Sequence, residues 1–409
     1  MKHIRLRKNY LFIENISALR LAKKYKTPFY CYSLAQLQDN YKALKDAFKN
    51  INPLICFSVK SNSNLKLLNE LKKMGSGADV VSIGELLKAT KAGIKNNKIV
   101  FSGVGKTEEE ILMAIRKRVL LINVESENEV NLINKIAKKF SRKIAIGIRL
   151  NPNVNGKTHK KISTGGKQEK FGLTQNDFLN LCKKIKKMKN LSLQGISVHI
   201  GSQITNIDPF KKVLSVMSKI INKTQIDFKF IDLGGGIGIS YSKNEKTINL
   251  KQYAKLVNKF LKDKNSKIIF EPGRSIIGNA AILITKIIYI KKSNGKNFVV
   301  LDAGMNNLMR PALYDARHQI IPLKKTNKLI RGNIEFVGPI CESSDKFSNE
   351  KKFSTIKEGD SIGLANVGAY GMSLSSNYNT RPIIAEIMIS GSNHKIIRKR
   401  QSLENLVNN

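Results

Sequence analysis

The sequence lacks residues on which several common protein architectures depend. It contains no tryptophan, and its four cysteines, Cys31, Cys56, Cys182 and Cys341, lie far apart without a Cys-x-x-Cys pair. This spacing argues against a structural zinc site and against a disulfide framework. We therefore expect no bound metal.

Long apolar runs are also missing. No run reaches the roughly 18 residues that a membrane-spanning helix needs. The basic residues 1–10 are followed neither by the apolar stretch nor by the small-residue cleavage site of a secretory signal. We expect a cytoplasmic protein without a membrane partner.

Acidic residues are scarce beside the basic ones. The chain has 72 Lys and Arg but 30 Asp and Glu, which gives a net charge of +42. Such an excess invites a nucleic-acid-binding interpretation. However, the lysines are spread over most of the expected helices, as in 183–187, and no basic-aromatic pattern of an RNA-recognition module occurs. We interpret the charge as lying on solvated faces, and we expect only weak, non-specific affinity for polyanions.

The 409 residues are enough for two or three domains, and from Leu54 onward they show a repeating pattern. A short apolar strand ends in polar or glycine residues, and an amphipathic helix follows. The expected strands cover 54–59, 78–82, 99–102, 119–124, 143–150, 193–200, 229–233 and 267–270. The expected helices cover 16–25, 34–49, a segment capped by Asn62 or Ser63 and ended by Gly75, and 84–92, 108–118, 126–140, 175–188, 208–223 and 249–263.

Eight strands that alternate with helices predict a (β/α)8 barrel, over residues 28–280. A doubly wound sheet is the alternative, but it would need a glycine-rich turn after the first strand, which is absent. After residue 280 the pattern changes to short β-rich runs separated by turn residues. These runs predict a second, antiparallel β domain over 281–409 that shares residues 1–27; they cover 282–290, 297–301, 334–337, 361–364 and 383–389.

Reactive side chains follow the expected barrel strands. In a barrel the C-terminal ends of all strands meet at one face, and active sites lie there. Any one of these side chains has an ordinary structural explanation, but their convergence at one rim predicts an active site. They are Lys60, Ser82 with Glu85, Arg149, His199, Asp232 and Glu271.

Whether Lys60 is an ordinary exposed lysine or a reactive one depends on the residues at the other strand ends. An isolated lysine at a strand end is ordinarily solvent-exposed, whereas a reactive one forms an imine with a carbonyl group. The glycine run 234–238 follows the seventh strand, where barrels often bind phosphate. Glu271 follows the eighth strand as an acidic group. An imine partner, a phosphate site and an acid for a ring nitrogen together predict pyridoxal phosphate, with His199 stacked on the ring; this cofactor suits decarboxylation.

With these residues in place, the chain resembles the diaminopimelate decarboxylase family of alanine-racemase-like (fold III) pyridoxal-phosphate enzymes. The resemblance runs from about residue 9 to about residue 386, and the matching segments occur in the family's order. They are 57–62, 77–86, 149–152, 170–172, 199–203, 234–236, 271–274, 302–305, 310–314, 341–345 and 368–371.

The resemblance implies an activity and a set of roles. The activity is decarboxylation of meso-2,6-diaminopimelate to L-lysine, the last step of bacterial lysine biosynthesis. Lys60 would carry pyridoxal phosphate, His199 would stack on it, and Glu271 would bind its ring nitrogen. Further cofactor contacts would come from Asp79, Ser202, Gly234, Gly235, Gly236, Gly273, Arg274 and Tyr370.

The resemblance also implies a homodimer whose active sites are shared across the interface. Cys341 of one chain would donate the proton that replaces carbon dioxide in the partner's site; its alternative role is that of a small buried hydrophobic residue. Lys170 and Asp345 match a pair that bridges subunits in relatives. The basic segment 157–170 has two open interpretations, a mobile flap over the site or a solvated loop.

The distal end of the substrate decides between related enzymes. Diaminopimelate carries a second amino-acid head, so its site needs cations for a carboxylate and an anion for an amine. Glu342 would supply the anion. The remaining distal contacts would come from Arg274, Arg310, Tyr314, Ser343 and Tyr370. The alternative substrates are ornithine, arginine and carboxynorspermidine, and Asp315 stands where such a relative holds a distal amine.

Two other functions remain weaker alternatives. A racemase of this fold class places an arginine at the ring nitrogen, where Glu271 stands here. A non-catalytic carrier of the cofactor would not need the segment around Cys341. The chain also departs from the family's common residues at Ser58, Ser61, Asn307 and Leu374, and we expect these changes to affect selectivity more than chemistry.

Overall fold

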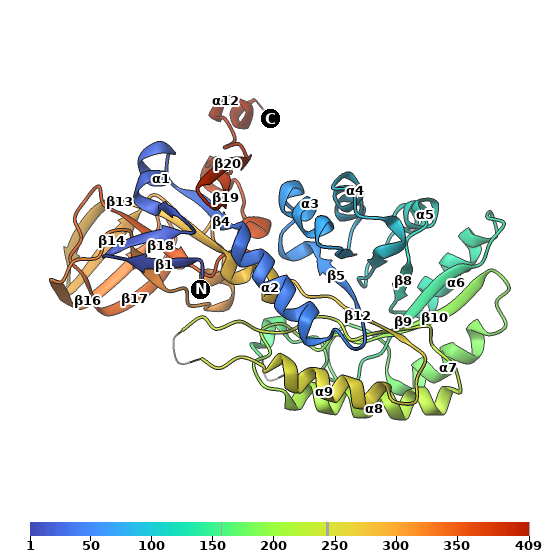
Figure 1. Ribbon diagram of the computed structural model, residues 1–409. Helices are drawn as coiled ribbons and strands as arrows, with labels where there is room; N and C mark the ends of the chain where they lie inside the picture. The colour runs from blue at the N-terminus through green and yellow to red at the C-terminus, as the bar shows by residue number, and fades with distance from the viewer. Residues whose placement is uncertain (157, 243–244, 409) are drawn as a thin grey trace. The chain divides into compact units, whose positions relative to one another are not determined.

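The computed structural model describes residues 1–156, 158–242 and 245–408 (Figure 1). The chain divides into two compact units. The barrel unit comprises Tyr41–Ile239 and Lys246–Ser275. The β unit comprises Met1–Asn40, Ser240–Glu245 and Ile276–Asn409. The first division falls after Asn40, whereas the sequence placed it after residue 27.

The barrel unit contains a closed barrel of parallel strands, so the predicted (β/α)8 architecture is confirmed. Around the barrel the order is β10-β11-β12-β5-β6-β7-β8-β9, and the pairing of Ile269 with Leu54 joins the last strand to the first. The strands are β5 (Leu54–Ser58), β6 (Gly77–Val80), β7 (Ile99–Phe101), β8 (Leu121–Val124), β9 (Ile144–Arg149), β10 (Leu191–Ser197), β11 (Phe230–Asp232) and β12 (Lys267–Phe270).

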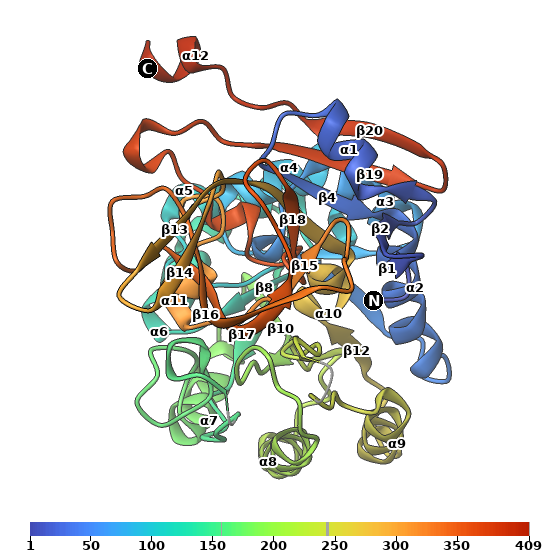
Figure 2. The ribbon, with the colours of Figure 1, turned by 90° about the vertical axis from the view of Figure 1, so that its left-hand side faces the viewer.

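Helices follow the barrel strands and cover the outside of the barrel; α8 lies between α7 and α9 (Figure 2). Thr107 begins one helix with both halves of a capping box, as its sequence predicts. The predicted cap at Asn62 or Ser63 is wrong, because the short turn η1 (Val59–Ser61) intervenes and Asn64 accepts the backbone N–H of Lys66 at 2.9 Å. The helices are α3 (Leu65–Lys73), α4 (Ile83–Lys91), α5 (Glu108–Lys117), α6 (Glu127–Ala137), α7 (Gln175–Ile185), α8 (Asp208–Thr224) and α9 (Leu250–Leu261), with short turns η2 (Asn96–Lys98) and η3 (Lys160–Ile162).

Apolar side chains fill the barrel near the strand starts. Leu54 begins β5, Leu121 begins β8 and Phe230 begins β11, and these three pack with Cys56, Val100 and Ile269. This cluster stabilises the barrel by removing apolar surface from water. Lys60, His199 and Glu271 instead follow the opposite, C-terminal ends of their strands.

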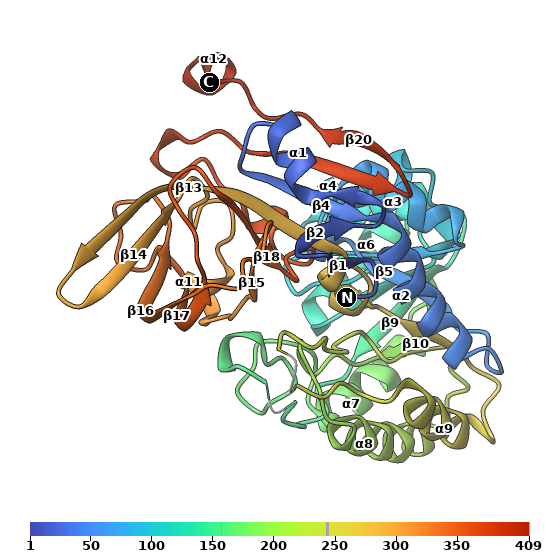
Figure 3. The same ribbon diagram turned by 60° about the vertical axis from the view of Figure 1, so that its left-hand side comes forward.

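The β unit contains a mixed sheet. Most of its pairs are antiparallel, as predicted, but β14 pairs with β16 and β4 pairs with β19 in parallel. Figure 3 shows the long strand β13 leading to β14, β16 and β17. The strands of this sheet are β4 (Phe29–Ser33), β13 (Ala281–Ser293), β14 (Lys296–Leu301), β15 (Ile320–Pro322), β16 (Leu329–Val337), β17 (Lys346–Ser354), β18 (Ser361–Ala365), β19 (Ala385–Ser390) and β20 (Asn393–Arg398).

The N-terminal residues belong to the β unit because their apolar side chains share its core. Phe29 and Cys31 of β4 pack with Leu11, Ile282 and Ile387. A small sheet of β1 (Ile4–Arg7), β2 (Tyr10–Ile13) and β3 (Ile16–Ser17) precedes α1 (Ala18–Lys24). The other helical segments are α2 (Leu34–Ala47), which runs from one unit into the other, α10 (Arg274–Ile277), η4 (Gly278–Ala280), α11 (Arg310–Tyr314), η5 (Met372–Leu374), η6 (Tyr378–Thr380) and α12 (Leu403–Val407).

Within the described ranges, no helix combines the length and the apolar character that crossing a bilayer requires. The same residues contain no cluster of three or more His, Cys, Asp or Glu side chains arranged to hold a metal ion.

Candidate active site

Lys60 lies in η1, directly after the first barrel strand. Its Nζ is 3.3 Å from Oδ2 of Asp79, a residue near the end of the neighbouring strand β6. The same Oδ2 accepts a hydrogen bond from Ser58 Oγ at 2.8 Å. The side chain of Asp79 is fully buried, whereas that of Lys60 is 36% exposed. A buried carboxylate therefore holds the amine of a partly exposed lysine side chain.

Glu85 is a second carboxyl group beside this pair. Burial raises its pKa to about 7, and the negative charge of Asp79 adds to the effect. The backbone N–H of Val81, which donates to Oε2 at 2.9 Å, opposes this rise without cancelling it. Glu85 therefore changes its charge near neutral pH, close to the reactive amine.

His199 follows β10 and is held as a neutral imidazole. The backbone N–H of Gly235 donates to its Nδ1 at 3.2 Å. Burial lowers the pKa of His199 well below its usual value, and the cations of Lys60 and Arg149 lower it further. Because Nδ1 accepts a hydrogen bond, the ring proton lies on Nε2. A neutral ring of fixed orientation suits stacking on a flat cofactor.

Glu271 and Asp232 form a buried carboxyl pair at the ends of β12 and β11. A side-chain hydrogen bond joins them. Burial, followed by repulsion from Asp232, raises the pKa of Glu271 well above its usual range; burial raises that of Asp232 to about 6. Glu271 therefore keeps its proton, and with it donates a hydrogen bond to Asp232. At neutral pH the pair carries one negative charge.

Two further polar side chains complete this network. Asn123 Nδ2 donates to Asp232 Oδ2 at 3.1 Å and to Ser102 Oγ at 3.2 Å, and Ser102 Oγ donates to Glu271 Oε1 at 3.3 Å. Both side chains are buried. We did not identify either residue from the sequence, although an asparagine inside the apolar strand 121–124 was a usable signal.

The glycine run after β11 approaches neighbouring backbone too closely for any side chain. A Cβ added at Gly235 would collide with the carbonyl oxygen of Glu271. Gly236 has a φ of +89°, a left-handed conformation that side chains disfavour. Gly273 is similarly confined, because an added Cβ would lie 2.9 Å from the side chain of Ser61. These positions leave bare backbone at the strand ends, as an anion-binding loop requires.

Ser202 and Arg274 supply polar side chains next to this loop. Arg274 donates to Ser202 Oγ from Nε at 3.1 Å and from Nη2 at 3.0 Å. Arg274 as a residue is only 5% exposed. A buried cation, a hydroxyl group and bare glycine backbone together can bind a phosphate group.

In the β unit, Cys341 and Glu342 lie in an exposed loop before β17. Cys341 Sγ accepts a hydrogen bond from Asn379 Nδ2 at 3.1 Å. Glu342 accepts one from the hydroxyl of Tyr378 and one from Ser344 Oγ at 3.0 Å. Ser343, the residue between Glu342 and Ser344, is exposed. Since Cys341 is exposed while the other three cysteines are buried, it is not the small core residue that was its alternative role.

Arg310 begins α11 and is buried in the β unit. Its Nη1 donates to Nε2 of His318 at 3.0 Å, and its guanidinium carbon lies 4.9 Å from the ring centre of Tyr241. The other ring nitrogen of His318 donates to the carbonyl of Ala365 at 2.8 Å, which leaves Nε2 free to accept. The hydrogen bond to His318 and the contact with the Tyr241 ring hold the guanidinium group in place.

The remaining predicted residues of the β unit are partly exposed. Tyr314 ends α11, and Tyr370 lies in the turn after β18 with a φ of +57°. A bulky residue in this left-handed region is a strained backbone position of the kind that clusters at functional sites.

Asp345 holds two loops of its own β unit through its carboxylate. Its Oδ1 accepts the backbone N–H of Met305 and its Oδ2 that of Ile340, each at 2.7 Å, and it is buried. Both carboxylate oxygens therefore hold the β unit's own loops. The predicted bridge from Asp345 to Lys170 of another subunit stays a prediction.

The segment 157–170 is tied to the barrel unit in its described part. Thr164 Oγ1 donates to the carbonyl of His199 at 2.9 Å, and the N–H of Val154 donates to the carbonyl of Gly165 at 2.8 Å. Lys157, at the start of the predicted basic flap, lies outside the described residues. These bonds connect the middle of the loop to the backbone of a predicted site residue.

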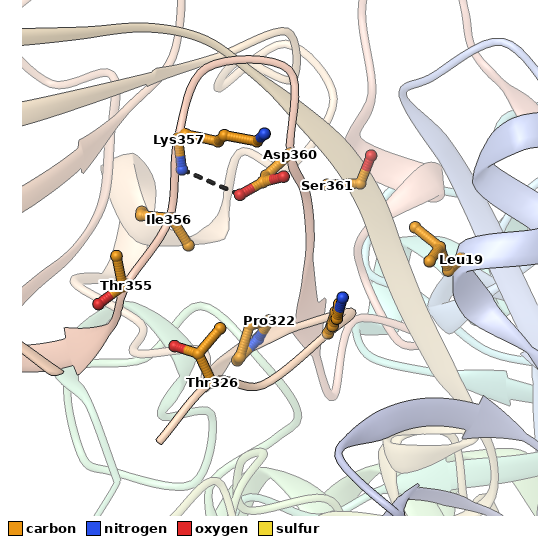
Figure 4. Close-up of a pocket in the computed structure, with 9 residues that line it drawn as sticks. Leu19, Pro322, Thr326, Thr355, Ile356, Lys357, Asp360 and Ser361 are labelled. Carbon is orange, nitrogen blue, oxygen red and sulfur yellow. Dashed lines mark hydrogen bonds between the residues drawn. The ribbon is translucent and has the colours of Figure 1, made fainter. Parts of the chain in front are cut away.

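Two cavities lie away from the predicted site residues. The β unit has one of about 340 Å³, whose lining side chains are drawn in Figure 4; it is lined by Leu19, Pro322, Lys324, Thr326, Thr355, Ile356, Lys357, Asp360 and Ser361. The barrel unit has one of about 270 Å³ near the starts of β8 and β9, with Arg118, Arg142 and Lys143 in its lining. Neither contains a residue predicted for the site.

The predicted residues thus fall into two groups, one in each unit. Direct contacts connect much of the barrel-unit group: Lys60 with Asp79, His199 with Gly235, Gly234 with Glu271, and Arg274 with Ser202. The β-unit group comprises Arg310, Tyr314, Cys341, Glu342, Ser343 and Tyr370.

Comparison with known proteins gives closely related sequences and structures. The family model described as pyridoxal-dependent decarboxylase, pyridoxal binding domain, matches residues 34–278. The chain is 41% identical over 410 residues to diaminopimelate decarboxylase of Aquifex aeolicus, covering 99% of this chain and 96% of that protein. It is 43% identical over 389 residues to diaminopimelate decarboxylase of Helicobacter pylori, covering 94% and 96%. A crystal structure of diaminopimelate decarboxylase from Helicobacter pylori complexed with L-lysine superposes with a TM-score of 0.91 at 42% identity, covering 95% and 98%.

Proposed function

The chain belongs to the pyridoxal-dependent decarboxylase family, and from this premise we propose that it is a diaminopimelate decarboxylase. In the proposed reaction a proton replaces one carboxylate of meso-2,6-diaminopimelate, which gives carbon dioxide and L-lysine. The observation that carries this proposal is the Lys60 amine, held by Asp79 at a barrel rim that also presents Glu271 and the glycine loop. The identity of about 40% over nearly the full chain supports the choice of substrate.

The cofactor of this family is pyridoxal phosphate, and the barrel unit fits it. Lys60 would bind its aldehyde carbon, and Glu271 would bind its ring nitrogen. Its phosphate would lie against Gly235, Ser202 and Arg274, where a side chain at residue 235 would collide with backbone. When bound, the cofactor accepts the electron pair that remains on the substrate's Cα after carbon dioxide leaves.

The protein's own groups prepare this site before substrate arrives. Asp79 keeps the Lys60 amine at the rim, so that the amine is in position when the cofactor binds. His199 offers a neutral ring face, because a cationic ring would repel a protonated cofactor ring. The Glu271–Asp232 pair supplies one negative charge for the ring nitrogen, and Asn123 fixes the orientation of Asp232.

The proton that replaces carbon dioxide would come from the thiol of Cys341. We propose that the protein acts as a homodimer in which this loop of one chain completes the site of the other, as the family resemblance implies. The exposure of Cys341 and Glu342 supports this role, since neither side chain is buried within its own chain.

The distal amino-acid head of the substrate would be bound by charged and polar groups. Glu342 would bind the distal ammonium group. The distal carboxylate would bind Arg310, whose stacked and hydrogen-bonded guanidinium is fixed for a planar partner. Tyr314, Ser343, Arg274 and Tyr370 would complete this part of the site. The alternative of ornithine, arginine or carboxynorspermidine decarboxylation has no use for a distal carboxylate site.

We also propose that the enzyme acts in the cytoplasm, without a nucleic-acid partner. Four free cysteines support a reducing compartment. The experiment that tests the function is carbon dioxide release from meso-diaminopimelate by the pyridoxal-phosphate-loaded protein. Ornithine, arginine and lysine serve as competing substrates, and release from one of them but not from diaminopimelate would overturn the assignment.

A further inference from the structure

Two consecutive residues of the β unit, Tyr378 and Asn379, donate hydrogen bonds to two other consecutive residues, Glu342 and Cys341. The hydroxyl of Tyr378 donates a hydrogen bond to Glu342 Oε1. Asn379, the next residue, donates from Nδ2 to Cys341 Sγ at 3.1 Å. The two contacts join segments that are 36 and 38 positions apart in the sequence. One short loop therefore orients both side chains of the Cys341–Glu342 pair.

The backbone of this loop is strained. Asn379 has a φ of +54° and Thr380 a φ of +51°, both in the left-handed region. Asparagine tolerates this region, but a β-branched threonine is a clear outlier there. Such positions cost about 1–3 kcal/mol each and persist only where the surrounding structure enforces them. The strain therefore indicates a conformation that the fold maintains against local preference.

The C-terminal residues enforce this conformation. Asn377 Nδ2 donates to the carbonyl of Arg381 at 2.8 Å and to Oε1 of Gln401 at 2.7 Å. The same oxygen of Gln401 accepts the N–H of Ile383 at 3.1 Å. On the other side, the N–H of Ser376 donates to the carbonyl of Asn306 at 2.9 Å. Both ends of the loop are thus anchored within the β unit.

Two hydroxyl groups orient the carboxylate of Glu342. Its donors, Tyr378 and Ser344, are neutral hydroxyl groups, and no lysine or arginine among the described residues forms a salt bridge with it. The hydrogen bond with Glu342, together with its negative charge, raises the pKa of Tyr378, so the phenol keeps its proton and remains a donor. Glu342 therefore presents an oriented anion, as recognition of an ammonium group requires.

We propose that Tyr378 and Asn379 are positioning residues, in which Tyr378 orients Glu342 for the substrate's distal ammonium group and Asn379 orients the Cys341 thiol for proton transfer. This inference rests on the proposed function. The two residues of this loop should have different effects. Tyr378 acts on substrate binding, and Asn379 acts on the step that delivers the proton.

The test compares two variants with two matched controls. Tyr378→Phe removes only the hydroxyl, and its control is Tyr289→Phe, an exposed tyrosine of β13. Asn379→Gly removes the amide while tolerating the left-handed backbone, and its control is Asn294→Gly at a residue with a φ of +47°. For each, kcat and KM for meso-diaminopimelate are measured, together with L-lysine binding by calorimetry and the melting temperature.

We expect Tyr378→Phe to raise KM and to weaken L-lysine binding by about tenfold or more, which is the effect of one hydrogen bond to a charged group. We expect Asn379→Gly to lower kcat by a similar factor and to leave L-lysine binding unchanged. The controls should match the wild type. Unchanged constants in both variants, or equal effects of both on binding and on kcat, would overturn the inference. If the wild type neither releases carbon dioxide nor binds L-lysine, it is the proposed function that fails.

A second measurement reads the Tyr378–Glu342 contact without cofactor. The ultraviolet absorbance of the phenolate is titrated in the wild type and in Tyr378→Phe, and the difference reports Tyr378 alone. We expect this difference to titrate above the ordinary tyrosine value of about 10 and to move down in Glu342→Gln. A difference curve at the ordinary value in the wild type would overturn the contact.

Discussion

The buried carboxylate of Asp79 lies 3.3 Å from the amine of Lys60, where Asp79 belongs to β6 and Lys60 follows the neighbouring strand β5. Ser58 donates to the same carboxylate oxygen, so the anion is held from two sides. A strand-end lysine would ordinarily extend into solvent. Here the carboxylate of Asp79 keeps the Lys60 amine at the rim of the barrel. A substitution of Asp79 tests this contact.

Asp79→Asn keeps the shape of the side chain and removes its charge. Because Lys60 then loses its anionic partner, we expect the affinity of the apo protein for pyridoxal phosphate to fall by about tenfold, which corresponds to about 1.4 kcal/mol. Titration of the apo protein with pyridoxal phosphate, followed by visible absorbance, measures this change. Asp208→Asn, at an exposed residue of α8, is the control. Equal affinities of wild type and Asp79→Asn would contradict the role of this contact.

Glu85→Gln should change how stability depends on pH. Burial raises the pKa of Glu85 from an ordinary 4.5 to about 7, so the folded state binds its proton more tightly than the unfolded state. The wild type therefore loses stability as pH rises from about 4.5 to about 7. Relative to the wild type, we expect Glu85→Gln to gain about 3 kcal/mol in free energy of unfolding between pH 4.5 and pH 8. Urea unfolding at both pH values measures it, with Glu109→Gln as an exposed control; a constant difference would contradict the raised pKa.

Gly235→Ala should abolish cofactor binding. The added Cβ would collide with the carbonyl oxygen of Glu271, which forces the glycine loop away from the strand ends. We expect a loss of pyridoxal phosphate affinity of about 100-fold or more, as a shifted anion-binding loop loses several hydrogen bonds. The control is Gly84→Ala in exposed α4, where the nearest atom lies at 3.9 Å and alanine favours the helix. Normal cofactor binding by Gly235→Ala would show that this loop does not hold the phosphate.

Arg310→Lys keeps a positive charge and removes the planar, stacked guanidinium. Because the distal carboxylate of diaminopimelate would lose a bidentate partner, we expect KM to rise by about tenfold with a smaller change in kcat. Steady-state kinetics measures the two constants. Arg331→Lys, at an exposed residue of β16, is the control. An unchanged KM would favour a substrate that has no distal carboxylate.

The barrel could be predicted from the sequence because its signals are local. The last strand was predicted at 267–270 and is observed there, and Thr107 with Glu110 predicted the start of α5. The strand β17 was missed, since its residues are largely polar and, among the described residues, it lies at the end of the sheet order next to β16. The strand β4 was missed too, because its five buried residues show no alternation that sequence periodicity can detect.

The candidate site could be predicted in part for the same reason. Residues at strand ends, such as Lys60 and Glu271, are brought to one rim by the barrel itself. The residues that contact them from distant parts of the chain show no local sequence pattern, so these contacts could not be predicted. Ser102 and Glu271 are 169 positions apart, and Asn379 contacts Cys341 through a strained loop whose conformation depends on the C-terminal residues.

The most direct test of the account is carbon dioxide release from meso-diaminopimelate by the wild-type protein and by Lys60→Ala, both supplied with pyridoxal phosphate. Lys183→Ala, at an exposed residue of α7, is measured beside them. We predict release by the wild type and by Lys183→Ala, and none above background by Lys60→Ala. Equal release by Lys60→Ala and the wild type, or no release by the wild type, would contradict the account.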